Sequence, residues 1–142
     1  MDLSLIPLVK NDLDFDIVVK MHNEPTIAKY ISISDTYFDY VVNAENVVYF
    51  KIQFQNQIVG GIHAEISDST LYLSICILPQ HRKSGLATFA LEKLFTLVPN
   101  TVEKVQVSID ETNIASVRLF EKLGFSPSGK EEKLLDYALN LK

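Results

Sequence analysis

The sequence has 142 residues, of which 47% are hydrophobic and 22% charged, so it can form one domain with a continuous core and does not resemble a disordered chain. Its net charge of −5 disfavours a nucleic-acid partner, because nucleic-acid binders carry an excess of basic residues. No apolar run is long enough to cross a bilayer, the first residues do not resemble a secretory signal, and the single cysteine, Cys76, excludes an intramolecular disulfide. We therefore expect a cytoplasmic protein with no membrane partner.

The first forty residues predict one strand followed by helical pieces. Leu3–Val9 is mostly apolar and contains Pro7, which suits an edge strand better than a central one. Asn11 or Asp12 is expected to cap a helix that ends before Pro25. The apolar positions of this helix, four residues apart, are Leu13, Ile17 and Met21. Two short helical or irregular pieces are expected next, Thr26–Tyr30 and Asp35–Val42.

From Val47 onward the pattern becomes that of β-strands. Three segments rich in β-branched and aromatic residues are predicted as strands: Val47–Gln55, Ile58–Ile66 and Thr70–Leu78. The turns between them are placed at Asn56-Gln57 and Asp68-Ser69. Such short connections predict an antiparallel meander, which Pro79 ends because proline cannot donate to a strand ladder.

The remainder predicts two helices and two further strands. Ser84–Leu97 and Asn113–Leu123 are predicted as helices, the second of them ended by Gly124. The residues expected on the apolar face of the first are Leu86, Phe89, Ala90, Leu94 and Leu97. Val102–Ile109 and Leu134–Leu141 alternate in polarity and are predicted as strands. A strand–helix–strand crossover from the meander implies a parallel, right-handed connection, so the fold class is mixed α/β with about six or seven strands.

The segment from Ile77 to Thr88 has the chemistry of a phosphate-binding turn. It runs from a strand end into a helix start, where free amides carry partial positive charge. Gly85 leaves room for an anion beside the backbone, Ala87 is small, and Arg82 adds positive charge. The alternative interpretation is that Gly85 serves only a turn.

Two motifs in the correct order suggest a family. The pattern Arg82-x-x-Gly85-x-Ala87 between a strand and a helix resembles the acetyl-coenzyme A signature of the GNAT superfamily of N-acetyltransferases. The pattern Asn113-x-x-Ser116-x-x-x-Phe120-x-Lys122-x-Gly124-Phe125 is similar to the second conserved segment of that superfamily. The resemblance is strongest from Thr70 to Phe125. It implies that residues 1–142 form one acyl-coenzyme A N-acyltransferase domain with two splayed parallel strands.

The resemblance also implies a set of residues for acetyl-coenzyme A as cosubstrate. The backbone of one splayed strand would pair with the pantetheine arm, and the following turn would hold the pyrophosphate. The residues implied for these contacts are Ile75, Cys76, Ile77, Arg82, Lys83, Ser84, Gly85, Leu86, Ala87, Thr88 and Asn113. No metal is expected, because His22, His63 and His81 have no metal-ligand spacing. Cys76 itself is expected to be a small buried hydrophobe and not a nucleophile.

The acid that protonates the departing thiolate is not the residue most common in the superfamily. Many relatives have a tyrosine where this chain has Phe120, and phenylalanine cannot donate a proton. Ser116 lies one helical turn earlier on the same face and is the predicted donor. The alternative is that Ser116 is a helix-surface serine bonded to a backbone carbonyl.

The base that takes the amine's proton is predicted on the second strand of the meander. His63 and Glu65 are two residues apart and therefore share one face of that strand. Either can accept the proton directly or through a water, and the alternative is an exposed polar strand face. Ser108 aligns with a glutamate of several relatives, and Asp110 and Glu111 are weaker candidates.

These features predict an enzyme that transfers acetyl from acetyl-coenzyme A to a primary amine by direct attack. Without an obvious strong base, an α-amine (pKa about 7.7–8) is easier to acetylate than a lysine (about 10.4). A protein N-terminus and a small-molecule amine, such as a polyamine or an aminoglycoside, are both open as acceptors. The alternative is a coenzyme A-binding module without catalysis, which Phe120 favours. A homodimer is compatible with the resemblance, but no surface can be assigned to it.

Overall fold

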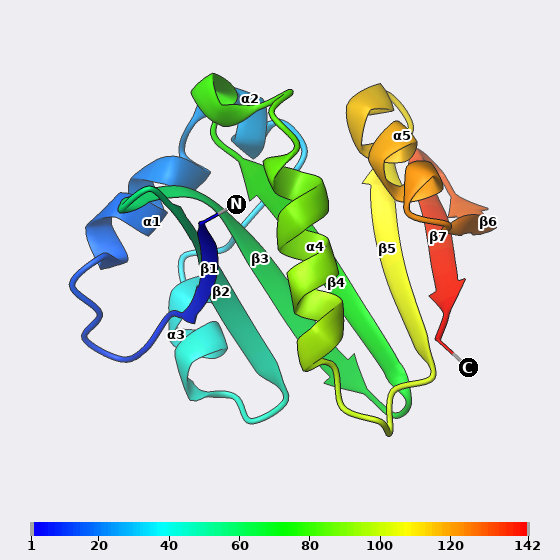
Figure 1. Cartoon of the computed structure of the whole chain (residues 1–142), viewed down its shortest axis with the longest axis horizontal. Coiled ribbons are helices and arrows are strands. Elements are labelled where there is room, and N and C mark those ends of the chain that lie inside the picture. The colour runs from blue at the N-terminus through cyan, green and yellow to red at the C-terminus, as the bar shows by residue number, and fades with distance from the viewer. Residues whose placement is uncertain (1, 142) are drawn as a thin grey trace.

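A computed structural model describes residues 2–141, and its strands form a single mixed sheet in the order β1-β2-β3-β4-β5-β7-β6 (Figure 1). The strands are β1 Leu3–Pro7, β2 Val47–Phe54, β3 Gln57–Ser67, β4 Thr70–Ile77, β5 Lys104–Asp110, β6 Ser126–Glu131 and β7 Leu134–Asn140. The helices are α1 Phe15–His22, α2 Pro25–Ala28, α3 Tyr37–Asn43, α4 Leu86–Leu97 and α5 Ile114–Lys122, and a 3-10 turn, η1, covers Pro79–His81. The predicted mixed α/β class is confirmed.

The meander and the crossover are both present. β1 to β4 pair antiparallel in sequence order, and β4 then pairs parallel with β5 after the α4 crossover. Gln55 and Asn56 both have positive φ, which a two-residue type I′ hairpin requires, so this turn lies one residue earlier than predicted. Within the described part of the chain, no helix is long and apolar enough to cross a membrane.

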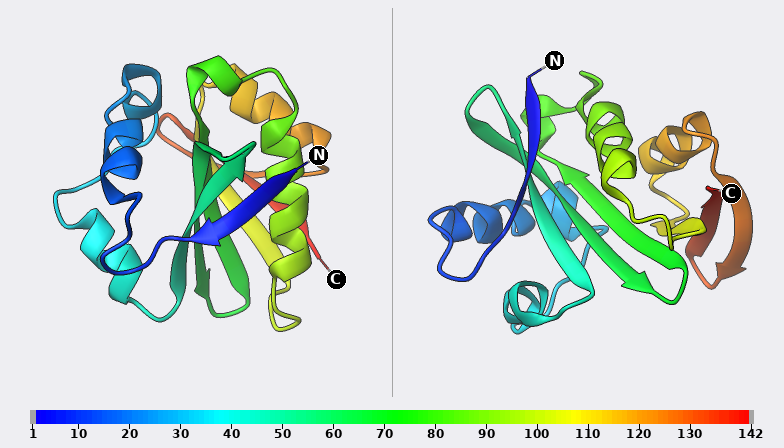
Figure 2. Two further views of the ribbon diagram at one scale, coloured as in Figure 1. Left: turned by 60° about the vertical axis from the view of Figure 1, so that its left-hand side comes forward. Right: turned by 60° about the horizontal axis from the view of Figure 1, so that its bottom comes forward.

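Helices cover the two faces of the sheet separately. α1 and α3 lie on one face, and α4 and α5 lie on the other (Figure 2). Alternate strand residues enter two hydrophobic clusters, because successive side chains of a strand point to opposite faces. The α4 face buries Ile62 and Leu73, for example, while the α1 face buries Tyr49 and Cys76. The candidate site residues come from both faces of the sheet.

The predicted apolar face of the first helix is confirmed at Met21 and wrong at Leu13 and Ile17. α1 begins at Phe15, and its buried residues are Val18, Met21 and His22. Leu13 lies before the helix and is 99% exposed, and Ile17 is 51% exposed. Apolar residues surround this helix on several sides, so periodicity alone does not choose the side that meets the sheet.

Two other expectations also need correction. α4 starts at Leu86 and not at Ser84, and two residues assigned to its apolar face, Phe89 and Leu97, are about half exposed. β6 was not predicted, because all of its residues are exposed and Pro127 and Gly129 argue against a strand. It forms as an edge strand through pairing with β7, with an irregularity between these two residues.

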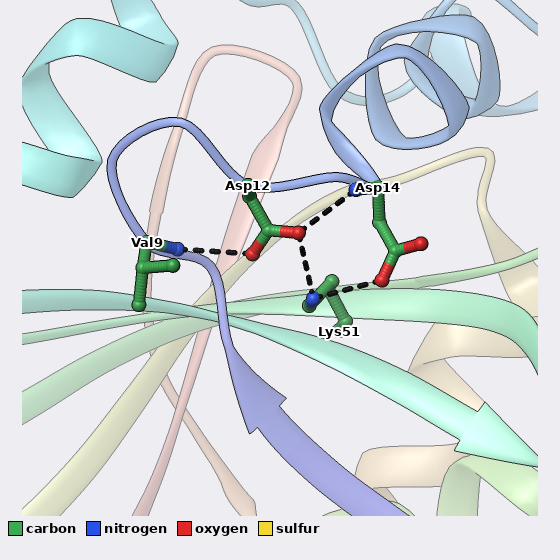
Figure 3. Close-up of polar contacts among 4 residues, drawn as sticks. All are labelled: Val9, Asp12, Asp14 and Lys51. Carbon is green, nitrogen blue, oxygen red and sulfur yellow. Dashed lines mark hydrogen bonds and ion pairs between the residues drawn. The ribbon is translucent and has the colours of Figure 1, made fainter.

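A buried lysine joins the segment before α1 to the sheet (Figure 3). Nζ of Lys51 on β2 lies 2.9 Å from carboxylate oxygens of both Asp12 and Asp14. Asp12 also accepts hydrogen bonds from the backbone N–H groups of Val9 and Asp14. Asp12 therefore holds the connecting loop. The prediction that Asn11 or Asp12 caps the helix is wrong, because the N-cap of α1 is Asp14.

Candidate active site

The strands β4 and β5 pair only at the start of their lengths. Thr70–Tyr72 pairs with Lys104–Gln106, and beyond these residues the two strands separate towards their carboxyl ends (Figure 1). The rest of β4, from residue 73 to Ile77, has β3 as its neighbour on one side only. An unpaired strand edge offers backbone donors and acceptors to an extended ligand.

The direction of the backbone groups on β4 can be followed from one hydrogen bond. The N–H of Leu78 donates to the carbonyl of Val59 on β3. Backbone groups of successive strand residues point to opposite sides, so Cys76 also faces β3, while Ile75 and Ile77 face the open side. The open edge therefore belongs to Ile75 and Ile77, and the backbone of Cys76 lies outside it.

The side chain of Cys76 is buried against α1. Its Sγ lies 4.0 Å from Nε2 of His22, a neighbour that sequence spacing did not reveal. Burial raises the pKa of this thiol to about 11, so it is protonated at neutral pH and is a poor nucleophile. The expectation that Cys76 is a small buried hydrophobe is confirmed by its 6% exposure.

The turn between η1 and α4 presents free amides at the end of the open edge. Gly85 is the N-cap of α4, adopts a left-handed φ of +83°, and caps the helix with no side chain. The first-turn amides, including those of Ala87 and Thr88, therefore lack a side-chain acceptor. Lys83 also has positive φ, and such alternating conformations form anion-binding concavities. The structure brings together the predicted segment 82–88.

Arg82 is tied to the same strand. Its Nε donates to the carbonyl oxygen of Ile77 over 2.8 Å, which leaves the terminal guanidinium nitrogens for another acceptor. Ser84 turns its hydroxyl back to the carbonyl of His81, 2.6 Å away. The residues present thus fit a pyrophosphate, because free amides and a fixed cation lie in one exposed turn.

The start of α5 lies on the β5 side of the opening. Asn113 is the N-cap of α5, and its Oδ1 accepts from the N–H of Ser116 over 3.3 Å. The hydroxyl of Ser116 has no hydrogen-bond partner among the residues that the structure describes, so the bond to a backbone carbonyl required by the alternative interpretation is absent there. Phe120 is 2% exposed and packs edge-to-face on Phe125.

On the opposite face, His63 and Glu65 belong to one hydrogen-bond network. Nε2 of His63 lies 3.2 Å from Oε1 of Glu65, which confirms that both side chains share a face of β3. Oη of Tyr37 lies 2.7 Å from Nδ1 of His63, and Tyr40 donates to Oε1 of Glu65 over 2.8 Å. Sequence reasoning missed both tyrosines, although their three-residue spacing in a short helix places them on one side.

The weaker base candidates are engaged elsewhere. Asp110 accepts from the N–H and the hydroxyl of Thr112, and these hydrogen bonds lower its pKa. Ser108 donates to a carboxylate oxygen of Asp136 on β7. Tyr30, just after α2, lies near Thr112, whose side chain lowers the pKa of the tyrosine hydroxyl.

A family model for "Acetyltransferase (GNAT) family" matches residues 15–125. The splayed strands and the glycine turn agree with this match, and the chain belongs to the GNAT acetyltransferase family. It is therefore an acetyltransferase. No curated protein matches it closely enough to serve as a relative.

Solved structures of similar fold cover nearly the whole chain. A domain from Methanocaldococcus jannaschii DSM 2661 is 25% identical, with a TM-score of 0.71 and coverage of 99% of this chain and 100% of that one. Spermidine N-acetyltransferase from Vibrio cholerae, solved with coenzyme A and spermine, is 16% identical, with a TM-score of 0.80 and coverage of 97% and 95%. The Campylobacter jejuni N-acetyltransferase PseH, solved with acetyl-coenzyme A, is 13% identical, with a TM-score of 0.75 and coverage of 99% of each chain.

Proposed function

We infer that this protein transfers the acetyl group of acetyl-coenzyme A to a primary amine. The observation that carries the proposal is the unpaired edge of β4, which leads directly to the free amides after Gly85. The backbone of Ile75 and Ile77 would pair with the pantetheine arm, and Arg82 with the first-turn amides would hold the pyrophosphate. Asn113, the N-cap of α5, is the proposed contact from the β5 side.

The proposed reaction is a direct attack of the amine on the thioester. A backbone N–H of the open β4 edge would stabilise the oxyanion of the tetrahedral intermediate, as preorganised amides do in other acyl transfers. The carbon–sulfur bond then breaks, the acetyl group stays on nitrogen, and the thiolate takes up a proton. The attacking nitrogen of the neutral amine loses one proton, which balances the proton that the thiolate gains. No covalent enzyme intermediate is needed.

Ser116 is the proposed proton donor to the thiolate. Its hydroxyl has no other partner among the described residues, whereas Phe120 at the position of the usual tyrosine is buried and has no proton to give. We expect Ser116→Ala to lower kcat about tenfold or more, since acid catalysis is worth up to about 10²–10⁴-fold. Steady-state kinetics with acetyl-coenzyme A measures this. Ser4→Ala on the exposed face of β1 is the control, and full activity of Ser116→Ala would contradict the assignment.

The base is proposed to be the pair formed by His63 and Glu65. The half-buried imidazole of His63 lies beside the carboxylate of Glu65, with Nε2 3.2 Å from Oε1. His63 is on β3 opposite Ser74, and Ser74 lies next to Ile75 at the open edge of β4. Neighbouring strands are about 4.8 Å apart, so the base lies about one strand away from the proposed thioester path.

An amine panel tests the function. We expect coenzyme A release from acetyl-coenzyme A when amines are supplied, with a peptide carrying a free α-amine acetylated faster at neutral pH than an N-terminally blocked peptide with one lysine. Spermidine and an aminoglycoside complete the panel. Preference for the lysine peptide across the pH range would sink the α-amine assignment. Binding of acetyl-coenzyme A without release for any amine would instead favour the non-catalytic module, for which the buried Phe120 is the structural argument.

The domain organisation, the oligomeric state and the location of the protein stay predictions with which the fold is compatible. Residues 1–142 are proposed to act as one domain, since all strands join a single sheet. A homodimer and a cytoplasmic location are proposed on the sequence arguments given above. No metal is assigned a role in the proposed reaction.

A further inference from the structure

The protons of the His63 network can be placed from its chemistry. An ionised carboxylate only accepts hydrogen bonds, so Oε1 of Glu65 receives one from Tyr40 and one from Nε2–H of His63. The hydrogen bond from Tyr40 to Glu65 raises the pKa of that tyrosine, as expected beside a negative oxygen. A neutral imidazole with its hydrogen on Nε2 must accept at Nδ1, and Tyr37 is the donor there.

This arrangement leaves His63 without a free lone pair. Nε2 is directed at Glu65 over 3.2 Å, and the lone pair of Nδ1 is directed at Oη of Tyr37 over 2.7 Å. The ring of Tyr37 also stacks on that of His63, with centroids 5.6 Å apart and an interplanar angle of 30°. A proton can therefore reach the imidazole only at Nδ1, where the Tyr37 hydroxyl lies in its path.

We propose that Tyr37 is the residue that receives the proton of the acceptor amine and passes its own hydroxyl proton to Nδ1 of His63. This inference rests on the proposed function, because it needs an amine at the β4 edge. In one concerted step, an ammonium N–H bond breaks and its proton joins Oη of Tyr37. The Tyr37 O–H bond breaks at the same time, and that proton joins Nδ1. The neutral amine then attacks the thioester, and an imidazolium paired with Glu65 is left.

The surroundings of Tyr37 favour a relay over an ionised tyrosine. Burial, together with the charge of Glu65, raises the pKa of Tyr37, so the residue does not rest as a tyrosinate. The other titratable groups packed around it are uncharged at neutral pH: burial lowers the pKa of His22 on α1 to about 4, and it raises those of Tyr49 on β2 and Cys76 on β4. The carboxylate of Glu65 is thus the acidic group in contact with His63, with its Oε1 3.2 Å from Nε2.

The test compares Tyr37→Phe with Tyr40→Phe. Both changes remove one hydroxyl from α3, but only the first removes the donor at Nδ1. With the free-α-amine peptide and with spermidine as acceptors, we expect kcat/KM of Tyr37→Phe to be about 10²-fold lower at pH 7. The deficit should shrink as the pH rises to 9.5, because solvent then deprotonates the amine. Tyr40→Phe leaves the donor at Nδ1 in place and should show a smaller deficit, while Ser34→Ala, which removes an exposed hydroxyl outside this network, should match wild type at every pH.

A variant of His63 tests the other residue of the relay. His63→Asn should show the same pH-dependent deficit, and the double variant with Tyr37→Phe should be no worse than the poorer single one, because the two residues act as a unit. A Tyr37→Phe deficit that is constant with pH, or activity within twofold of wild type, overturns the relay. If wild type acetylates neither acceptor while still binding acetyl-coenzyme A, the proposed function itself fails, and the relay fails with it.

Discussion

Gly85→Asp is expected to abolish the stabilisation that acetyl-coenzyme A gives to the folded protein. A ligand at about a hundred times its Kd adds roughly 2.7 kcal/mol, which raises the Tm of a domain of this size by several degrees. At φ of +83° an aspartate is strained, and its negative charge lies beside the proposed pyrophosphate. Thermal unfolding with and without acetyl-coenzyme A, coenzyme A and a nucleotide control measures the effect.

Gly124→Asp is the matched control for this experiment. Gly124 also has a left-handed φ, +96°, but it follows α5 and does not lie in the α4 turn. This variant should unfold at a lower temperature than wild type and still gain stability from the ligand. If the Tm of Gly85→Asp rises with the ligand as much as that of wild type, the proposed pyrophosphate site is misplaced. If wild type gains nothing, acetyl-coenzyme A binding by this chain is contradicted.

Lys51→Met is expected to cost about 3–5 kcal/mol of unfolding free energy, because it removes the cation that neutralises the buried carboxylate of Asp12 and the partly exposed one of Asp14. The side chains of Lys51 and Asp12 are each only 6% exposed, and Asp14 is 35% exposed. Urea unfolding measures the change, and Lys10→Met at an exposed position should stay within about 0.5 kcal/mol of wild type. Adding Asp12→Asn and Asp14→Asn should recover much of the loss, and a cost below about 1 kcal/mol for Lys51→Met alone would show that the cluster is not stabilising.

The loss of unfolding free energy in Lys51→Met should depend on pH, and the pKa shifts of Asp12 and Lys51 determine the direction. Burial alone raises the pKa of Asp12, but hydrogen bonds from Asp14, Lys51 and Val9 outweigh it and lower that pKa. Its contribution to stability is therefore present above about pH 3.9 and lost as the pH falls through the folded value. Burial alone lowers the pKa of Lys51, but its hydrogen bonds to the carboxylates raise it, so its contribution is lost only as the pH rises through a value above the usual one. The penalty of Lys51→Met should be full at neutral pH and shrink on acidification.

The elements with a strong local pattern were predictable. The three meander strands are segments rich in β-branched and aromatic residues, and turn residues separate them. Their existence therefore follows from short-range preferences. Gly85 and Gly124 occupy left-handed positions at helix ends, where a residue without Cβ is strongly preferred. The edge strand β6 has no such pattern and exists through pairing with β7, which no local preference encodes.

The candidate site was predictable on one face of the sheet and less so on the other. The phosphate turn is contiguous from Arg82 to Thr88, so its amides and its cation are adjacent in sequence as well as in space. His63 and Glu65 were placed together by the two-residue period of a strand. The two tyrosines that complete their network come from α3, more than twenty residues earlier, and the sequence does not say where that helix packs.

The sequence by itself determined the order of the strands and helices apart from β6, together with the position of the glycine turn and the two family motifs, because each depends on residues a few positions apart. Only the tertiary structure decided that β4 separates from β5 after Tyr72, that Tyr37 lies on His63, and that Lys51 has two carboxylates. These contacts join residues 26 to 39 positions apart or depend on strand pairing. Such contacts form because buried polar groups require partners and because the twisted sheet places distant segments together.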